Sequence, residues 1–259
     1  MFEMGLHFCS MPQAINRFAA MDKKPVLVIG THGKTTISSI LAWILYESNL
    51  DPSFFIGGIL NNFNSNYRQG KGEYIVIEGD EYDTAFFDKG PKFLHYDPHV
   101  AVLTSIEFDH ADIFIDIDHV KEVFERFISG ISQQNMLLAF DRDKNIAGLV
   151  GSSKCHVIYY GTEKGSDWRL GRISIEPPLT VFEVIKGDMV FGSFKTKLMG
   201  EHNLLNALSA IAVADNLMIS KETVASALES FQGIKRRQEV RGQKRKIIVM
   251  DDFAHHPTA

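Results

Sequence analysis

The chain has few cysteines, no excess of positive charge and no long apolar run, and each absence excludes a class of protein. Its two cysteines, Cys9 and Cys155, have no metal-ligand spacing, so we expect them to be packing residues in a reducing compartment. Lysine and arginine number 27 against 32 acidic residues, and the net charge of −5 argues against a nucleic-acid-binding protein. No apolar run is long enough to span a bilayer. We therefore expect a cytoplasmic protein with neither nucleic-acid nor membrane partners.

The composition is that of a folded globular protein. The chain has 259 residues, of which 45% are hydrophobic and 23% are charged, so it can bury a substantial core. Apolar residues recur at helical spacing over 37–45 and 120–128. Short apolar runs typical of strands lie at 25–29, 74–77, 100–103, 136–140 and 156–160. Strands that alternate with helices predict an α/β fold with a mostly parallel sheet flanked by helices.

The pattern changes after residue 168. Apolar residues at 181–184 face those at 189–191 across Lys186-Gly187-Asp188, which predicts a hairpin and hence a small antiparallel β addition. Two alanine- and leucine-rich helices and a last strand are predicted at 202–218, 221–232 and 246–250. This last strand and its trailing residues cannot bury a face by themselves, so we expect them to begin a further unit.

The junction between the first strand and the first helix reads Gly30-Thr31-His32-Gly33-Lys34-Thr35-Thr36. Glycines allow backbone N–H groups to turn toward a phosphate, and the start of a helix adds partial positive charge at the same place. Lys34 supplies a cation and Thr35 a hydroxyl for magnesium. The general phosphate-loop pattern has a glycine where this chain has Val28, so the loop is tighter. The motif predicts nucleotide binding, and an ordinary glycine turn before a helix is the alternative.

Four carboxylates lie within six residues at the end of the predicted strand 74–77, in Glu78-Gly79-Asp80-Glu81-Tyr82-Asp83. In open α/β sheets, ligands bind at the carboxyl ends of the strands. Like charges this close together cost about 4 kcal/mol per pair at an effective dielectric constant of about 20, so the cluster is expected to need a cation or water. Magnesium bound to nucleotide phosphates would satisfy it. The alternative interpretation is an acidic surface loop.

His110 follows the next predicted strand, in Glu107-Phe108-Asp109-His110. A neutral imidazole is a reasonable second ligand for a metal already surrounded by oxygens, and a neighbouring carboxylate can orient it. His110 is therefore a candidate metal contact. The alternative is a histidine with a structural role only.

Asn203 and Asn206 are three residues apart near the start of the predicted helix 202–218, so they share one face. An amide side chain offers both a donor and an acceptor, which suits the edge of an adenine ring. Helix capping is the alternative, since asparagine is among the best capping residues. Capping accounts for one asparagine but leaves the second without a role.

Two further polar segments lie near the end of the chain. Asp251-Asp252-Phe253-Ala254-His255-His256-Pro257-Thr258 lacks the spacing of a helical zinc site, so we favour a nucleotide or substrate role over zinc or a polar loop that starts a helix. Lys235, Arg236 and Arg237 form a short basic cluster, for which a solvated helix end is an alternative to a binding role.

Taken in order, the motifs GTHGKTT, EGDEYD, EFDHADIF, GEHNLLNALSA, KRR and DDFAHHPTA resemble those of the Mur ligase family, and the resemblance covers nearly the whole chain. It implies a phosphate-loop domain from the centre of a three-domain enzyme that builds peptidoglycan precursors. The runs DEYDTAFFDKGPKF and EFDHADIF resemble the branch that joins the tripeptide L-alanyl-γ-D-glutamyl-meso-diaminopimelate to UDP-N-acetylmuramate, a muropeptide-recycling reaction. The alanine-adding branch is the nearest alternative.

The resemblance implies an ATP-dependent, C–N bond-forming reaction that needs ATP and Mg²⁺. In the family the substrate carboxylate attacks the γ-phosphate to give an acyl phosphate and ADP, and the incoming amine of the muropeptide then displaces phosphate. Catalysis of this kind consists mainly of positioning and charge neutralisation.

The resemblance also implies a role for each matching position. Gly30, Thr31, Gly33, Lys34, Thr35 and Thr36 would form the phosphate loop, with Lys34 on the β- and γ-phosphates. Thr35 and Glu78 would bind the first magnesium and His110 the second. Asn203 and Asn206 would contact the adenine, and Arg237 would contact the γ-phosphate. Asp252 would contact the ribose, and His255 would contact the reacting groups. The implied catalytic residues are Lys34, His110, Arg237 and His255.

One position departs from the family pattern. Many relatives carry a carbamylated lysine one helix after the Asp-His pair, and this chain has Phe127 in that region. The second metal site is therefore absent or is completed differently, as in the alanine-adding branch.

The resemblance implies three parts: residues 1–23 as the tail of a missing N-terminal domain or linker, 24–238 as the central ATP-binding domain, and 239–259 as the start of a C-terminal domain. As such a fragment, the chain is expected to bind ATP and Mg²⁺ without turnover. A phosphate-loop NTPase switch without ligase activity is the alternative from another class, and it would need segments that order around the γ-phosphate. The sequence does not indicate an oligomeric state.

Overall fold

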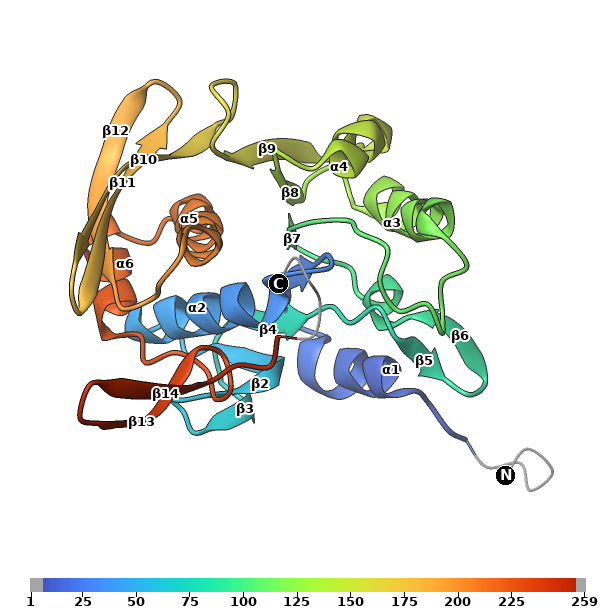
Figure 1. The fold of residues 1–259 in the computed structure, drawn as a ribbon. Coiled ribbons are helices and arrows are strands. Elements are labelled where there is room, and N and C mark those ends of the chain that lie inside the picture. The colour runs from blue at the N-terminus through green and yellow to red at the C-terminus, as the bar shows by residue number, and fades with distance from the viewer. Residues whose placement is uncertain (1–6, 255–259) are drawn as a thin grey trace.

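The computed structural model describes residues 7–254, which form a curved ten-stranded sheet covered by helices on both faces (Figure 1). The strand order is β12-β11-β10-β9-β8-β7-β1-β4-β2-β3. Its strands are β1 Lys24–Ile29, β2 Ser53–Leu60, β3 Ser65–Arg68, β4 Tyr74–Glu78, β7 Val100–Leu103, β8 Met136–Phe140, β9 His156–Gly161, β10 Trp168–Glu176, β11 Leu179–Lys186 and β12 Met189–Thr196. The predicted α/β fold with a mostly parallel sheet is confirmed.

The helices lie on two sides of this sheet. Helices α2, α5 and α6 lie on one side, and α3 and α4 lie on the other (Figure 1). The α-helices are α1 Met11–Ile15, α2 Lys34–Glu47, α3 Ile117–Gly130, α4 Lys144–Leu149, α5 Glu201–Asn216 and α6 Lys221–Ser230. A short π-helix, η2 Asn16–Ala20, and two short 3₁₀ helices, η3 Lys92–His95 and η4 Val150–Ser152, complete the helical segments of the described residues. Among the described residues, no helix combines the length and the apolar character that crossing a membrane requires.

Strand β1 lies at the centre of the sheet and contributes to a core on each side of it. Val26 and Val28 are buried against α2 and α5, whereas Leu27 and Ile29 are buried against α3 and its neighbours. This alternation follows from the two-residue repeat of a strand. A strand that is buried on both faces reads as a continuous apolar run, which is why the sequence pattern identified it.

The chain order reverses at β1, because β1 pairs in parallel with β4 on one side and with β7 on the other. Connections that leave a sheet in opposite directions open a crevice at the carboxyl ends of the central strands. The loops that follow β1, β4 and β7 therefore meet at one edge. These loops hold the phosphate-loop motif, the acidic segment and His110.

Several elements differ from the sequence prediction. The pattern did not identify β2 and β3, which extend the sheet beyond β4. The predicted hairpin is β11 and β12, and it continues the main sheet through β10. Two further pairs form separate two-stranded sheets, namely β5 Asp83–Ala85 with β6 Asp88–Pro91 and β13 Glu239–Lys244 with β14 Ile247–Asp251.

Candidate phosphate-binding site

The loop after β1 has the backbone that a phosphate-binding loop requires. Gly30 and Gly33 have φ values of 116° and 80°, in the region that favours glycine. A Cβ on Gly30 would lie 2.8 Å from the backbone of Ser105. Helix α2 starts at Lys34, and its first backbone hydrogen bond runs from Ile37 N–H to the Gly33 carbonyl at 3.0 Å. The N–H groups of the first turn therefore have no acceptor within the helix and point toward an incoming anion.

The loop is fixed from its far side by the segment that follows β7. Thr31 N–H donates to the Ser105 carbonyl at 2.8 Å, and Thr31 Oγ1 accepts from Glu107 N–H at 2.9 Å. His32 N–H donates to Ser105 Oγ at 3.1 Å. The Thr31 hydroxyl is thus used to hold the loop in shape, and Thr36 is buried in the first turn of α2.

Thr35 and Glu78 meet at the mouth of the loop. Thr35 Oγ1 donates to Glu78 Oε1 at 2.8 Å, and Glu78 Oε2 accepts from Gly57 N–H at 2.7 Å. A hydroxyl and a carboxylate are hard oxygen ligands of the kind that Mg²⁺ selects, usually together with substrate phosphates. Within residues 7–254, no cluster of three histidine, cysteine or acidic side chains has metal-binding geometry. A magnesium ion held here would need phosphate oxygens or water to complete its ligands.

Lys34 is held inside the loop by three partners from this chain. Its Nζ donates to the carbonyl of Gly30 at 2.5 Å and to that of Thr31 at 3.2 Å, and it lies 2.7 Å from Glu81 Oε2. The side chains of Lys34 and Glu81 are only 13% and 5% exposed. Burial raises the pKa of Glu81 to about 7, against the attraction of Lys34, which lowers it. The sequence motif identified Lys34 but gave no separate role to Glu81.

The acidic segment does not act as one cation-binding cluster. Asp80 pairs with Lys92 at 2.5 Å, Glu81 with Lys34 at 2.7 Å and Asp83 with Lys89 at 2.8 Å. Glu78 alone of the four has no lysine partner in the described part of the chain. The cluster was expected to need a cation or water, and lysine ammonium groups of this chain supply the positive charge for three of its four carboxylates. The surface-loop alternative fails at Glu81, which is buried, whereas Asp80 and Asp83 are partly exposed.

His110 lies in the loop after β7, with a positive φ of 57°. Its Nε2 is 3.8 Å from Asp109 Oδ2, and its ring contacts that of Tyr82 with 4.3 Å between centroids. Tyr82 belongs to the acidic segment, so the loops after β4 and β7 touch here. In residues 7–254 no hydrogen bond joins His110 to Thr35 or Glu78, and its role as a metal ligand stays a prediction.

The two asparagines lie beside the loop. Asn206 Oδ1 would be 2.5 Å from a Cβ on Gly33, so this side chain packs directly on the loop backbone. Asn206 Nδ2 donates to Asn203 Oδ1 at 3.4 Å, and Asn203 Nδ2 donates to Met199 O at 2.8 Å and to Gln238 Oε1 at 3.1 Å. The capping alternative is wrong, because α5 begins after Gly200 without a side-chain cap. Sequence reasoning gave no signal for Gln238.

The basic cluster is not a helix end. Helix α6 ends at Ser230, and Lys235 N–H donates to the Ile59 carbonyl at 3.0 Å, which fastens the segment to β2. Arg237 is half-buried, and its Nη1 donates to the Phe253 carbonyl at 3.5 Å. The neighbouring Gln238 contacts Asn203, so the basic segment runs past the asparagine pair.

The last motif is only partly described. Asp252 is exposed and follows β14. His255 lies outside the described residues, and its contact with the reacting groups stays a prediction. The ribose role of Asp252 and the γ-phosphate role of Arg237 stay predictions.

Phe127 is part of the apolar core on the α3 side. Its ring packs edge-on against Phe93 with 5.4 Å between centroids, and Phe93 stacks on Phe124 at 5.0 Å. This position is filled by hydrocarbon and offers no metal ligand.

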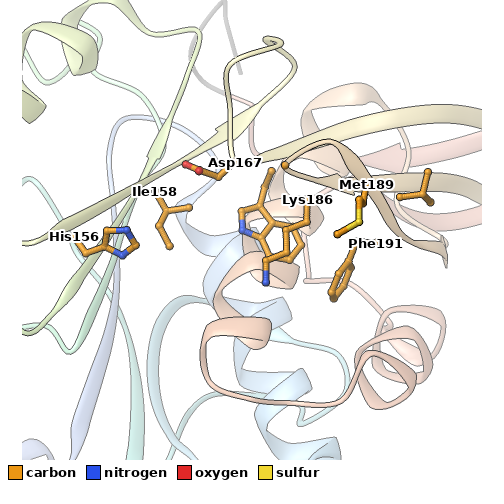
Figure 2. Close-up of a pocket in the computed structure, with 9 residues that line it drawn as sticks. His156, Ile158, Asp167, Lys186, Met189 and Phe191 are labelled. Atoms are coloured by element: carbon orange, nitrogen blue, oxygen red, sulfur yellow. The ribbon is translucent and has the colours of Figure 1, made fainter.

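Hollows of different size lie on the surface of residues 7–254. The larger, of about 700 Å³, lies along β9–β12 and is lined by His156, Trp168, Lys186 and Phe191 among others, none of them from the loops described above (Figure 2). The smaller, of about 80 Å³, is lined by Glu78, Asp80, Lys92 and Tyr96 among others. Of these two, only the smaller hollow adjoins the Thr35–Glu78 pair. We therefore place the candidate phosphate and metal site on that side of the molecule, although the hollow there is smaller.

Comparison with known proteins gives a consistent result. Residues 28–214 match the family described as Mur ligase middle domain. The chain is 37% identical over 257 residues to the UDP-N-acetylmuramate–L-alanyl-γ-D-glutamyl-meso-2,6-diaminoheptandioate ligase of Escherichia coli, covering 99% of this chain and 56% of the relative. It is 39% identical over 237 residues to the UDP-N-acetylmuramate–L-alanine ligase of Clostridium tetani, covering 91% of this chain and 50% of the relative.

A solved structure gives the same fold. The crystal structure of UDP-N-acetylmuramate:L-alanyl-γ-D-glutamyl-meso-diaminopimelate ligase from Neisseria meningitides superposes with a TM-score of 0.82 at 35% identity, covering 91% of this chain and 74% of that one. The chain spans about half the length of the curated relatives that it matches.

Proposed function

We propose, since the chain belongs to the Mur ligase family, that it is the nucleotide-binding central part of an ATP-dependent ligase that forms a C–N bond. The reaction proposed is the joining of L-alanyl-γ-D-glutamyl-meso-diaminopimelate to UDP-N-acetylmuramate, which reuses muropeptides for peptidoglycan. The match to the Escherichia coli tripeptide ligase, which runs over 99% of the chain, supports this substrate class. The similar identity to the Clostridium tetani alanine ligase keeps L-alanine as the second candidate acceptor.

One observation carries the proposal: Thr35 Oγ1 and Glu78 Oε1 lie 2.8 Å apart at the mouth of a glycine-rich loop that opens a helix. The loop supplies backbone N–H groups for phosphate, and the pair supplies two hard oxygen ligands beside it. In this proposal Thr35 and Glu78 hold the first magnesium. Magnesium, when bound, neutralises charge on the phosphates and so favours transfer of the γ-phosphoryl group.

The other side chains are given roles by their place around the loop. We assign Lys34 to the β- and γ-phosphates, Asn203 and Asn206 to the adenine, and Arg237 to the γ-phosphate. The packing of Asn206 on Gly33 and the contact of Asn203 with Gln238 support a nucleotide that lies between the loop and the basic segment. His110 as a second metal contact, Asp252 as a ribose contact and His255 near the reacting groups complete the proposal.

The substrate carboxylate would attack the γ-phosphate, breaking its bond to ADP and giving an acyl phosphate, which the amine of the acceptor then converts to an amide with loss of phosphate. The protein's part in such a reaction is to align the reactants and to neutralise charge. The cytoplasm, where ATP and sugar nucleotides are made, is the proposed compartment.

We also propose the three-part organisation of residues 1–23, 24–238 and 239–259. The hairpin of β13 and β14 pairs with no strand of the main sheet in the described structure. Residues 247–250 of β14 are 44–68% exposed although they are apolar. An apolar strand of this kind needs a cover, which supports its assignment to a further domain. The fragment is accordingly proposed to bind nucleotide without completing ligation.

The proposal is tested in two steps. The 259-residue chain is titrated with ATP at fixed Mg²⁺ by calorimetry, and saturable binding that EDTA abolishes is expected. The full-length enzyme is then assayed for amide formation with UDP-N-acetylmuramate and either the tripeptide or L-alanine. Product with L-alanine alone would move the chain to the alanine-adding branch, and hydrolysis of ATP without amide formation would favour the NTPase switch.

A further inference from the structure

The ammonium group of Lys34 is surrounded by acceptors from this chain. An ammonium has three N–H donors, and those of Lys34 face the carbonyls of Gly30 and Thr31 and the carboxylate of Glu81. No donor remains for a phosphate. Lys34 can therefore bind a triphosphate only after it gives up one of these three partners.

Glu81 is the partner whose loss has the largest electrostatic consequence. Its side chain is almost fully buried, and a buried carboxylate without a cation is strongly disfavoured. The charged groups around it are Lys34, from the start of α2, and Asp80, from its own loop. Asp80 is itself paired with Lys92 of η3, so Lys92 does not replace Lys34 beside Glu81.

We propose that Glu81 is a positioning residue that holds Lys34 in the empty loop and releases it to the nucleotide by taking up a proton from solvent. The inference rests on the proposed function, because it assumes that Lys34 binds phosphate. In this exchange the carboxylate of Glu81 becomes a neutral carboxyl, Lys34 keeps its positive charge, and the negative charge lost at Glu81 is replaced by that of the phosphates. The buried pocket thus never holds an unpaired anion.

The burial of Glu81 supports this exchange near neutral pH. Because burial raises the pKa of Glu81 to about 7, its carboxyl group is mostly ionised at pH 8 and mostly protonated at pH 6 before nucleotide binds. Nucleotide binding is therefore expected to take up close to one proton at pH 8 and about one tenth of a proton at pH 6. From pH 6 to pH 8, the nucleotide affinity of the wild-type chain is expected to fall about tenfold relative to that of a variant without the carboxyl group.

The experiment is calorimetry of the 259-residue chain with a non-hydrolysable ATP analogue and Mg²⁺, in two buffers of different ionisation enthalpy, at pH 6 and pH 8. The difference in heat between the buffers gives the number of protons taken up. The variant Glu81→Gln retains the shape of the side chain, and it is expected to lose this proton uptake and to bind about tenfold more tightly than wild type at pH 8 but equally at pH 6.

A matched control and a fold check complete the test. Glu73 also pairs with a lysine, Lys24, at 2.6 Å, but this pair is exposed. Glu73→Gln removes the carboxylate of that pair and should keep the wild-type proton uptake. If Glu81→Gln does not fold, the wild-type measurement at pH 8 decides alone.

Uptake of no proton by wild type at pH 8, or equal uptake by wild type and Glu81→Gln, overturns this inference. The proposed function still stands in that case if Lys34→Ala weakens ATP binding about tenfold or more. Absence of nucleotide binding by wild type at both pH values overturns the inference and the proposed function together.

Discussion

Thr35 and Glu78 are 43 residues apart in the chain, yet the hydroxyl of one donates to the carboxylate of the other at 2.8 Å. The sheet register explains this contact, since β1 and β4 are adjacent and parallel and Val28 lies opposite Glu78. The chain leaves β1 two residues later and enters the glycine loop. Glu78 therefore stands at the end of its own strand, beside the first turn of α2.

Replacing Glu78 with glutamine tests this pair as a metal site. The amide keeps the shape of the side chain but removes the negative charge that binds a divalent cation. We expect Glu78→Gln to raise the Mg²⁺ concentration needed for half-maximal ATP binding by on the order of tenfold to a hundredfold. The measurement is a Mg²⁺ titration at fixed ATP.

Asp83→Asn is the matched control, because Asp83 belongs to the same acidic segment but pairs with the exposed Lys89. It should leave the Mg²⁺ titration unchanged. An identical Mg²⁺ requirement for Glu78→Gln and wild type would remove Glu78 from the metal site.

Truncation of Lys34 tests the phosphate contact. Hydrogen bonds to charged groups contribute about 1.5–3 kcal/mol, so Lys34→Ala should weaken ATP binding about tenfold to a hundredfold. The fold should survive at pH 6, because Glu81 can take up a proton once its partner is gone. Binding is measured by calorimetry and folding by circular dichroism. Lys89→Ala, at an exposed lysine that also pairs with an acidic residue, should bind as wild type does.

The sheet and the loop were predictable because their signals are local. Strands buried on both faces read as apolar runs, and the glycine and lysine positions of the loop follow from the backbone that phosphate requires. Strand β2 was missed because Gly57 and Gly58 interrupt its apolar pattern. Both glycines are needed by the fold, since a Cβ on Gly58 would lie 2.7 Å from Thr35 Cγ2 and one on Gly57 would lie 3.1 Å from the Glu78 carboxylate.

The division of the acidic segment was not predictable from its composition. Four adjacent carboxylates indicate a shared cation, but their actual partners, Lys34, Lys89 and Lys92, lie on other elements or across a turn. Which lysine reaches which carboxylate depends on side-chain directions that only the folded sheet fixes. Gln238 was missed for the same reason, since its contact with Asn203 joins residues that are 35 apart.

The stability of the protein should depend on the ionisation of Glu81. A carboxyl group whose pKa is higher in the folded state than in the unfolded state binds more protons when folded, so its contribution to stability falls as pH rises. For Glu81 this loss occurs between about pH 4.5, the ordinary pKa of a glutamate, and about pH 7, the pKa in the folded chain. It amounts to about 3 kcal/mol.

The check is the difference in the free energy of unfolding between wild type and Glu81→Gln, measured with urea at pH 5 and pH 8. Wild type should lose stability relative to the variant on going to pH 8. A difference that does not change with pH would mean that Glu81 has an ordinary pKa in the folded chain.

Lysine at position 127 should not restore a metal site. Phe127 is 6% exposed and packs against Phe93, so Phe127→Lys places a charged group in the apolar core. We expect the free energy of unfolding to fall by more than about 3 kcal/mol, whereas Phe127→Leu should cost less than about 1.5 kcal/mol. Urea unfolding measures both values. A Phe127→Lys variant as stable as wild type would show that this position opens to the site.

Gly33 should tolerate no side chain, for two separate reasons. Its φ of 80° costs an L-residue about 1–2 kcal/mol, and a Cβ would lie 2.5 Å from Asn206 Oδ1. Gly33→Ala should therefore lower the free energy of unfolding by at least about 1–2 kcal/mol and weaken ATP binding, because Asn206 and the loop backbone must move apart.

Gly148 provides the control, since it lies in helix α4 and a Cβ there meets nothing within 4 Å. Gly148→Ala should raise the free energy of unfolding by up to about 1 kcal/mol and leave ATP binding unchanged. Urea unfolding and nucleotide titration of the two variants separate loop geometry from a general intolerance of alanine. If Gly33→Ala binds ATP as wild type does, the contact between Gly33 and Asn206 has no part in holding the nucleotide, and the adenine assignment of Asn206 loses its structural support.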